Sequence, residues 1–322
     1  MKRLLPVFGL FLFAVQTTVL ADYSERDDVQ QFISEMVQKH DFDRAELNKK
    51  FADANRLDGV LEAIAKPAEK VLTWEQYRPI FVKPKRINLG NEFLREYQPI
   101  LARAEKEYGV PAEIITAVIG VETYYGRHKG RTDVFDSLVT LGFDYPPRAK
   151  FFRKELEQFL LLAREEGIDP RSIKGSYAGA MGMPQFISSS YRHYAVDFDG
   201  DGRRDLWNST ADVIGSVANY FKLHNWVAGE PVVIRARVSA PVKEETRNKL
   251  KPHTRVADFA KQGVQPKSAV DGDEMATLVT LHGKNGKEYW LGLNNFYSIT
   301  RYNHSALYAM AVYELSLEFD TQ

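Results

Sequence analysis

Cysteine is absent from this chain of 322 residues. Its absence excludes disulfides, thiolate metal sites, a cysteine nucleophile and a lipid-modified N-terminal cysteine. No two of the seven histidines have the HExxH spacing, so a catalytic zinc site of that kind is not expected. The folded chain must therefore be held together by its hydrophobic core or by a bound metal ion.

An excess of charge of one sign is also absent, since 43 Lys and Arg residues balance 43 Asp and Glu residues. Without a basic excess, no nucleic-acid partner is expected. The length is sufficient for two or three packed units. Only one long apolar run is present, close to the N-terminus, so we expect the mature protein to be soluble and monomeric.

That apolar run has the features of a secretory signal peptide. Lys2 and Arg3 precede residues 4–15, which are almost wholly apolar and too few to span a bilayer comfortably. Ala21 then offers a small residue for cleavage before Asp22. A buried N-terminal helix is the alternative, but it fits the flanking residues less well. The sequence predicts a signal peptide over residues 1–21 and a soluble location in the periplasm.

The remaining chain predicts an α+β fold that is mainly α. Apolar residues recur at helical spacing before and after one segment, residues 231–291, in which β-branched residues predominate. There, Asn285-Gly286 separates two strand-like runs and indicates a hairpin. We expect four segments after the signal peptide: an N-terminal helical domain at residues 22–89, a helical core at residues 90–230, a small β subdomain at residues 231–291 and a C-terminal return to the core at residues 292–322.

Glu122 is the candidate catalytic residue. Ile115, Val118 and Ile119 precede it by seven, four and three residues, so Glu122 continues the apolar stripe of one helix. Burial disfavours the charged carboxylate and raises its pKa, which suits a general acid near neutral pH. The alternative is a structural glutamate paired with Arg127 or Arg148.

Four segments together resemble the lytic murein transglycosylase B family. The first carries Glu122 in the sequence GVETYYGR, and the second ends in Gln185-Phe186. The resemblance runs from about Trp74 to Tyr313 and is weakest across the β segment. Four motifs in order are more specific than any one of them. The segments are residues 120–127, 176–186, 191–226 and 295–304.

The resemblance implies a lysozyme-like core and an enzyme that acts on peptidoglycan glycan strands. It implies cleavage of the β-1,4 bond between N-acetylmuramic acid and N-acetylglucosamine. Glu122 would protonate the glycosidic oxygen and then, as carboxylate, take the proton of the muramoyl C6 hydroxyl, which attacks C1. The product is a 1,6-anhydro ring, and the substrate's own N-acetyl group would stabilise the cationic intermediate. Proteins of cell-wall synthesis or division are possible partners.

Two other functions stay open from the residues alone. Asp133, Asp136 or Asp144 could act as base or nucleophile in a hydrolytic muramidase, because spacing does not give the carboxylate separation on which that choice rests. A calcium-stabilised peptidoglycan-binding protein without catalysis is the third possibility, although the intact Glu122 motif argues against it.

Substrate-binding residues follow from the aromatic content around the motifs and from the resemblance. Sugars bind by stacking on aromatic faces and by hydrogen bonds, and the Gln185 amide can both donate and accept. The family often has a residue other than Pro184 before this glutamine, so a backbone donor is lost there. The candidates are Tyr77, Arg148, Ser176, Gln185, Phe186, Tyr220, Asn295, Tyr297 and Tyr302.

A calcium loop is predicted by carboxylates at alternate positions followed by glycine. Asp197, Asp199 and Asp201 stand at positions 1, 3 and 5 of an EF-hand-like loop, and the backbone carbonyl of Arg203 stands at position 7. Hard oxygen ligands favour calcium over magnesium. Position 12 is Asn208 rather than glutamate, and the resemblance implies a longer loop closed by Asp212. We expect the ion to be structural; the alternative is a solvated acidic turn.

Overall fold

The computed structural model describes residues 22–65, 72–239 and 249–320. The chain divides into two units between Arg56 and Leu57. The predicted signal peptide, residues 1–21, lies outside the described residues. Within the described ranges, no helix combines the length and the apolar character that crossing a membrane requires.

The first unit is a small helical bundle. It contains η1 (Tyr23–Glu25), α1 (Asp27–His40) and α2 (Arg44–Ala52). Asp43 caps α2 by accepting a hydrogen bond of 2.7 Å from the backbone N–H of Glu46. Phe32 and Phe51 meet edge to face with their ring centroids 5.9 Å apart, and they form the centre of the unit's core.

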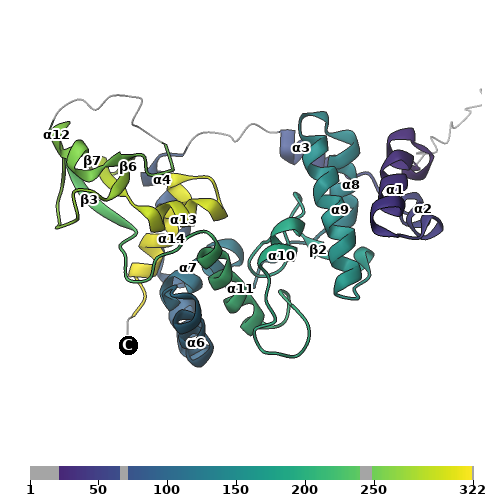
Figure 1. Ribbon diagram of the computed structural model, residues 1–322, viewed down its shortest axis with the longest axis horizontal. Helices are drawn as coiled ribbons and strands as arrows, with labels where there is room; N and C mark the ends of the chain where they lie inside the picture. The colour runs from purple at the N-terminus through teal and green to yellow at the C-terminus, as the bar shows by residue number, and fades with distance from the viewer. Residues whose placement is uncertain (1–21, 66–71, 240–248, 321–322) are drawn as a thin grey trace, which may run out of the picture. The chain divides into compact units, whose positions relative to one another are not determined.

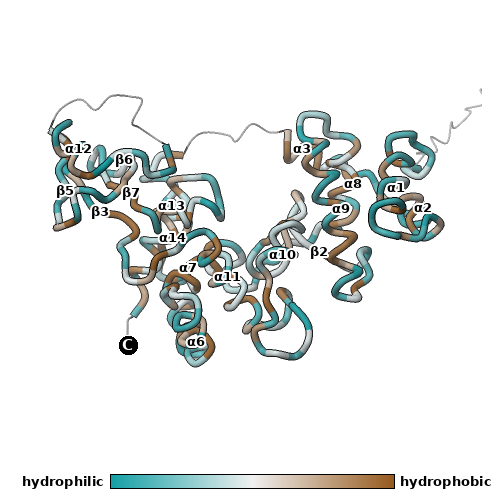
Figure 2. The backbone as a smooth tube through the Cα atoms, viewed as in Figure 1, coloured by the Kyte–Doolittle hydropathy of each residue, from teal (hydrophilic) through white to brown (hydrophobic). Residues whose placement is uncertain are grey.

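The second unit contains a helical body that is built around α7 (Ala112–Thr123). This helix contacts α5, α6, α11 and α14, and it is buried from Ile114 to Val121. Figure 1 shows the helices of this body, and Figure 2 shows hydrophobic stretches along α7. The helices before it are α3 (Asp58–Ala65), α4 (Trp74–Phe81), α5 (Pro84–Glu96) and α6 (Gln98–Tyr108).

The remaining helices of the body follow α7 in the chain. α8 and α9 pack on each other, and α14 packs on both α7 and α4. A short two-stranded ladder joins β1 to β2, with Thr132 opposite Gly175. The elements are β1 (Thr132–Asp133), α8 (Val134–Asp144), η2 (Pro146–Arg148), α9 (Ala149–Glu165), η3 (Pro170–Ser172), β2 (Lys174–Gly175), α10 (Ser188–Tyr194), α11 (Thr210–Leu223), α13 (Asn294–Tyr302) and α14 (Ala306–Leu317).

The β subdomain is an antiparallel five-stranded sheet in the order β4-β6-β7-β3-β5. Its core includes Ile234, Phe259, Leu278 and Leu291, which are almost wholly buried. The sheet and its one helix comprise β3 (Val233–Val238), β4 (Thr254–Arg255), α12 (Val256–Lys261), β5 (Val264–Pro266), β6 (Met275–Gly283) and β7 (Gly286–Gly292). The predicted α+β fold, mainly α with a small β subdomain, is confirmed.

The predicted hairpin forms, but its turn differs from the expected one. Gly283 pairs with Gly286, so Lys284 and Asn285 are the turn residues. Gly286 has φ of 104°, whereas Asn285 is not among the residues with positive φ. The glycine therefore supplies the left-handed conformation at the start of β7, and the asparagine does not need it.

The predicted N-terminal domain, residues 22–89, requires a correction. Residues up to Arg56 form the first unit, whereas α4 and α5 belong to the second unit and pack on α14 and α7. The helical periodicity of α4 and α5 shows that each has a buried face, but periodicity does not identify the element that covers it. Tertiary packing therefore sets this boundary.

Asn295 connects the start of α13 to the chain before the β subdomain. Its side chain is fully buried. Its Oδ1 accepts from the backbone N–H of Val227 at 2.8 Å, and its Nδ2 donates to the carbonyls of Val227 and Glu230 at 2.8 and 2.9 Å. This amide therefore fixes the turn at 227–230 from which the chain enters β3.

Candidate active site

Glu122 lies one residue before the end of α7, where the backbone turns sharply. Tyr124, Tyr125 and Gly126 have φ of 56°, 59° and 79°. A left-handed conformation is unfavourable for non-glycine residues, so neighbouring contacts must hold this turn. Thr123 supplies two of them, because its Oγ1 donates to the carbonyl of Met183 at 2.8 Å and accepts from the N–H of Gly126 at 3.0 Å.

The carboxyl group of Glu122 is poised near neutral pH. Burial raises the pKa of Glu122 from 4.5 to about 7, and a hydrogen bond from Tyr308 opposes part of that rise. Tyr308 Oη donates to Oε1 of Glu122 at 2.6 Å. The side chain keeps partial access to solvent, although protein atoms surround its carboxylate. Such a group can carry a proton at neutral pH and can also release it.

No cation is paired with Glu122 within the described part of the chain. The predicted alternative partners lie elsewhere: Arg127 is exposed, and Arg148 stacks over the rings of Phe151 and Phe152 at 4.5 and 5.0 Å. The structural interpretation of Glu122 as one half of an ion pair with either arginine is therefore wrong. An ion pair would have lowered the pKa instead of leaving it raised.

Tyrosines surround the Glu122 carboxyl group. Burial, with the charge of Glu122 as the next cause, raises the pKa of Tyr77 and of Tyr302. Tyr302 stacks on Tyr308 with centroids 6.4 Å apart and planes at 12°. Tyr302 Oη also donates to the carbonyl of Pro184 at 2.6 Å. The structure thus brings two of the predicted substrate residues, Tyr77 and Tyr302, into the surroundings of Glu122.

Phe186 and Tyr220 extend this aromatic cluster. The Tyr302 ring lies 5.7 Å from Phe186 and 4.7 Å from Tyr220, measured between centroids. Tyr220 also stacks on His224 at 4.0 Å and donates its hydroxyl hydrogen to the carbonyl of Arg301 at 2.5 Å. Both Phe186 and Tyr220 are almost wholly buried, so their rings pack against Tyr302 from within the protein.

Gln185 has φ of 52° in the turn after Gly182, and only the donor end of its amide is bound. Nε2 donates to the carbonyls of Gly182 and Lys129 at 3.0 and 3.3 Å. Its Oε1 accepts no hydrogen bond from the residues that the structure describes. Because the side chain is partly exposed, this oxygen is available to a donor such as an acetamide N–H.

The other predicted substrate residues are placed less directly. Ser176 Oγ accepts from the N–H groups of Ala178 and Ala180 at 3.3 and 2.9 Å and so shapes the glycine-containing turn. Tyr297 is partly exposed, with the guanidinium of Arg301 5.8 Å from its ring centroid. Asn295 requires a correction, because its buried amide is fully used by the 227–230 backbone and cannot reach a sugar.

Tyr308 contacts Glu122 but is not among the candidate residues predicted from the sequence. On α14 it lies three, four and seven residues before Ala311, Val312 and Leu315, all buried. A polar hydroxyl on a buried helical stripe is the same signal that singled out Glu122. Such a hydroxyl needs a partner, and that partner is the Glu122 carboxyl group.

The nearby aspartates are engaged in other interactions. Asp136 is buried and pairs with Arg171. Asp133 caps α8 by accepting from the N–H of Asp136 at 3.0 Å, and its other oxygen pairs with Lys174 at 3.2 Å. Asp144 is the last residue of α8. Asp133 and Asp136 are thus both held in ion pairs.

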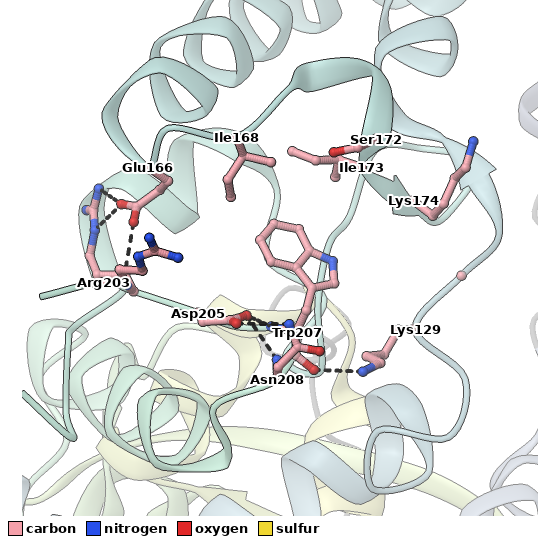
Figure 3. Close-up of a pocket in the computed structure, with 12 residues that line it drawn as sticks. Lys129, Glu166, Ile168, Ser172, Ile173, Lys174, Arg203, Asp205, Trp207 and Asn208 are labelled. Carbon is pink, nitrogen blue, oxygen red and sulfur yellow. Dashed lines mark hydrogen bonds and ion pairs between the residues drawn. The ribbon is translucent and has the colours of Figure 1, made fainter. Parts of the chain in front are cut away.

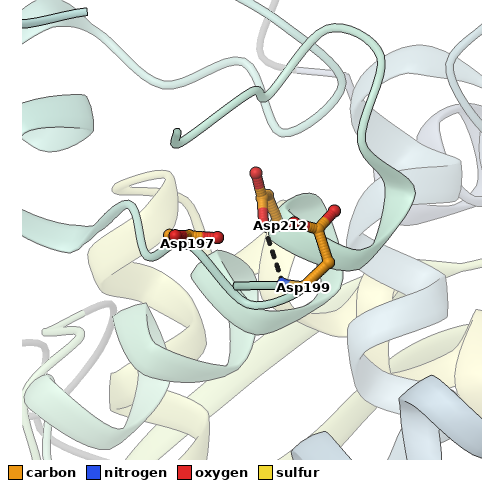
Figure 4. A group of neighbouring side chains, drawn as sticks. All are labelled: Asp197, Asp199 and Asp212. Carbon is orange, nitrogen blue, oxygen red and sulfur yellow. Dashed lines mark hydrogen bonds between the residues drawn. The ribbon is translucent and has the colours of Figure 1, made fainter. Parts of the chain in front are cut away.

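A cluster of three carboxylates forms in the predicted calcium loop. Ligand oxygens of Asp197, Asp199 and Asp212 lie within 4.8 Å of one another, and Figure 4 shows the three side chains converging. No cationic side chain pairs with them in the described ranges, so a hard cation would offset their repulsion. Position 12 of the loop is Asn208, and the third carboxylate of the cluster comes instead from the buried Asp212, four residues later.

Asp201 and Arg203 of the predicted ligand set lie outside this cluster. Asp201 Oδ1 accepts from the N–H of Arg203 at 2.9 Å, and the N–H of Asp201 donates to Asp197 at 3.1 Å. Asp212 holds the loop from its other end by accepting from the N–H groups of Phe198 and Asp205 at 2.7 and 2.8 Å. The donor set and its spacing thus fit a calcium ion at Asp197, Asp199 and Asp212.

The comparison with known families decides the identity of the fold. The family described as a transglycosylase SLT domain matches residues 24–317. The chain belongs to this family. It is 45% identical over 319 residues to membrane-bound lytic murein transglycosylase B of Escherichia coli K12, which covers 95% of this chain and 87% of that protein.

Solved structures of SLT-domain transglycosylases share the fold. The catenated lytic transglycosylase SltB1 from Pseudomonas aeruginosa matches with a TM-score of 0.90 and 52% identity over 92% of this chain and 98% of that chain. The E. coli lytic transglycosylase Slt35, solved in complex with calcium, matches with a TM-score of 0.86 and 46% identity over 92% and 94% of the two chains.

A more distant SLT relative was solved with a cell-wall fragment. SltB3 from P. aeruginosa, in complex with NAG-anhNAM-pentapeptide, matches with a TM-score of 0.79 and 31% identity over 89% of this chain and 77% of that chain. The predicted resemblance, the lysozyme-like core and the assignment as a lytic transglycosylase enzyme are therefore confirmed. The alternative of a binding protein without catalysis is wrong. The roles of the individual site residues stay predictions.

The raised pKa of Glu122 predicts that this residue lowers stability at alkaline pH. The folded state favours the protonated form of Glu122. The contribution of this group to stability is therefore complete below about pH 4.5 and is lost as the pH rises through about 7. We expect Glu122→Gln to raise the free energy of unfolding by about 2 kcal/mol at about pH 8 and to change it little at about pH 4. The partial exposure of the side chain to solvent reduces the effect at about pH 8 to this value. Urea unfolding at both pH values measures this, and an equal effect at both would contradict it.

Proposed function

We propose that this protein cleaves the β-1,4 bond between N-acetylmuramic acid and N-acetylglucosamine in peptidoglycan and releases a 1,6-anhydromuramoyl product. The observation that carries the proposal is one carboxyl group, Glu122, with a pKa of about 7, a tyrosine hydrogen bond and no cationic partner among the described residues. An acid of this kind can serve both halves of the reaction at neutral pH.

In the first half, protonated Glu122 donates its proton to the glycosidic oxygen, and the bond between that oxygen and C1 of the muramoyl residue breaks. The neighbouring N-acetyl group of the substrate stabilises the positive charge that develops at C1. Glu122 is then a carboxylate, and Tyr308 stabilises it through the 2.6 Å hydrogen bond to Oε1.

In the second half, the Glu122 carboxylate takes the proton of the muramoyl C6 hydroxyl, and the C6 oxygen bonds to C1. This closes the 1,6-anhydro ring, returns Glu122 to its protonated form and consumes no water. A hydrolytic mechanism would use a second carboxylate as base or nucleophile. The ion pairs of Asp133 and Asp136 favour the anhydro-forming route over hydrolysis.

The residues around Glu122 would bind and orient the glycan. Tyr77 and Tyr302 offer rings beside the carboxyl group, and Oε1 of Gln185 is available to an acetamide N–H. Phe186 and Tyr220 would hold the Tyr302 ring in place through their buried contacts with it. Ser176, Tyr297 and Arg148 complete the proposed set, with Ser176 shaping the turn next to Gln185.

Calcium would be a structural ion in this protein, held by Asp197, Asp199 and Asp212. The relative Slt35 was solved in complex with calcium, which supports this assignment. Asp201 and the backbone carbonyl of Arg203 would add ligands from the same loop. The ion would supply charge compensation to the loop, and all proton transfer would stay with Glu122.

Periplasmic export and a monomeric state complete the proposal. The positive start, the apolar run at residues 4–15 and the small residue at Ala21 support a cleaved signal peptide. Peptidoglycan glycan strands would be the substrate in that compartment, and proteins of cell-wall synthesis or division would be possible partners.

Glu122→Gln is expected to abolish turnover, because glutamine cannot exchange a proton near neutral pH. We expect a loss of at least about 100-fold while the variant keeps the native fold. Mass spectrometry of fragments released from cell-wall sacculi measures both the amount and the mass of the product, which is one water lighter than a hydrolytic product. Glu113→Gln, at the other end of α7, is the matched control. Comparable product from both variants would remove Glu122 from its role.

Tyr308→Phe is expected to shift the pH profile. The hydroxyl stabilises the charged form of Glu122, so its removal raises the pKa of Glu122 above about 7. The loss of kcat/KM on the alkaline side should then move up by about 0.5–1 pH unit, with a lower maximal rate. Tyr313→Phe on the same helix should leave the profile unchanged. A downward shift in the Tyr308 variant would contradict this assignment.

Calcium is expected to raise the melting temperature, by about 5 °C at saturating concentration, because it binds the folded loop. Asp197→Ala should lose this response. Asp273→Ala, which removes an exposed carboxylate of the β subdomain, should keep it. Differential scanning fluorimetry with calcium and with a chelator tests the site, and equal melting curves for the wild-type protein would rule it out.

A further inference from the structure

A cavity of about 470 Å³ lies apart from the residues assigned to the Glu122 chemistry. Its walls come from three segments: the loop at Lys129–Gly130, residues 166–174 after α9, and residues 203–208 in the second half of the predicted calcium loop. Figure 3 shows these segments enclosing it. The volume lies within the range of about 300–1,000 Å³ that is typical of small-molecule sites. None of the predicted substrate residues lines it.

Trp207 provides an aromatic wall of this cavity. Figure 3 shows its indole pointing from the 205–208 segment toward Ile168 and Ile173 on the opposite side. The ring is partly exposed and is supported by Tyr191, with centroids 5.5 Å apart. Its backbone is fixed as well, since its N–H donates to Asp205 at 2.8 Å and its carbonyl accepts from Nζ of Lys129 at 2.7 Å. A rigid, partly exposed indole of this kind is suited to stacking on a sugar ring.

Positive charge exceeds negative charge around the indole. Four basic and two acidic side chains line the cavity. Arg204 is paired with Glu166, and Lys174 is paired with Asp133. Lys129 donates only to a neutral carbonyl, and Arg203 is exposed with no carboxylate paired to it in the described ranges. These two cations are therefore available to an anionic ligand.

Two hydrogen bonds connect the cavity to the Glu122 site. The carbonyl of Lys129, whose side chain lines the cavity, accepts from Nε2 of Gln185 at 3.3 Å. The N–H of Met183, whose carbonyl anchors Thr123, donates at 2.8 Å to the carbonyl of Leu206, which lies between the lining residues Asp205 and Trp207. Hydrogen bonds through Leu206, Met183 and Thr123 thus link the segment that forms one wall of the cavity to the end of the helix that carries Glu122.

We propose that this cavity is a second binding site for the peptidoglycan polymer, one that takes an N-acetylated amino sugar bearing an anionic peptide. The sugar ring stacks on Trp207, and carboxylates of the peptide pair with Arg203 on one side of the indole and with Lys129 on the other. This inference rests on the proposed function, because it assigns a further contact to the same substrate. It gives the enzyme a preference for glycan strands that carry stem peptides.

The test follows the indole signal of Trp207 by NMR in calcium-loaded, ¹⁵N-labelled Glu122→Gln protein, which does not consume the ligand. Trp207→Phe assigns this signal among the four tryptophans. Titration uses two probes: the N-acetylglucosamine–N-acetylmuramic acid disaccharide with a tetrapeptide, and the same disaccharide without it. We expect both to shift the Trp207 signal, and the peptide-bearing probe to bind about fivefold more tightly at this site.

Charge variants test whether Arg203 and Lys129 contact the peptide directly or attract the probe only through the overall charge of the protein. Arg203→Gln keeps the backbone of the loop and removes an exposed charge, so it should weaken the peptide-bearing probe at Trp207 by about fivefold and leave the peptide-free probe unchanged. Lys129→Met removes the other cation together with its hydrogen bond to the Trp207 carbonyl, so it should weaken the peptide-bearing probe more than the peptide-free probe. Lys284→Met, which removes an exposed lysine in the β6–β7 turn, is the matched control and should change neither. Melting curves with calcium confirm that each variant is folded.

The outcomes distinguish this site from the proposed function. A Trp207 signal that stays unmoved by both probes, or equal binding of both probes in all variants, overturns the second site. Release of anhydro products by wild-type protein is measured on the same sacculi. If these products appear while Trp207 does not respond, the proposed function stands and the second site falls. If no product appears, the proposed function falls whatever the Trp207 signal does.

Discussion

The structure depends on one acid that is held among protein atoms and has no cationic partner within the described ranges of the chain. Raising the pKa of Glu122 from 4.5 to about 7 costs on the order of 3 kcal/mol when the group is charged. A surface helix could not impose that cost, because water would solvate the carboxylate. α7 can impose it because α5, α6, α11 and α14 all pack on it. Tyr308 then limits the cost by giving the carboxylate one hydrogen bond.

Close packing also explains why the helix ends where it does. The Tyr125 ring lies between α7 and α5, and its hydroxyl donates to the carbonyl of Arg86 at 2.9 Å. A Cβ atom at Gly120 or at Gly90 would lie only 2.6 Å from atoms of that ring or its hydroxyl. These two positions therefore require glycine, and the ring that they admit fixes the left-handed turn after Thr123. The turn leaves Glu122 in the last turn of a rigid helix.

Local patterns in the sequence predicted the parts of the site that are formed by residues close together in the chain. Helical spacing placed Glu122 on a buried face, and alternate carboxylates placed Asp197 and Asp199 together. Contacts between distant segments could not be predicted in the same way. Periodicity marks Tyr308 as buried but does not say that it meets a residue 186 positions away. Likewise, the motif containing Asn295 does not reveal that a backbone turn already uses its amide.

The calcium loop and the Glu122 turn are coupled through a short path of backbone contacts. Asp212 holds the N–H of Asp205, and the next residue, Leu206, accepts from the N–H of Met183. A Cβ at Gly182 would lie 2.6 Å from that same Leu206 carbonyl, so the two segments are in contact. Met183 in turn accepts from Thr123, the residue after Glu122. In a chain without cysteine, an ion in this loop would therefore hold the segment that supports the turn after Glu122, as a disulfide does in many small secreted domains.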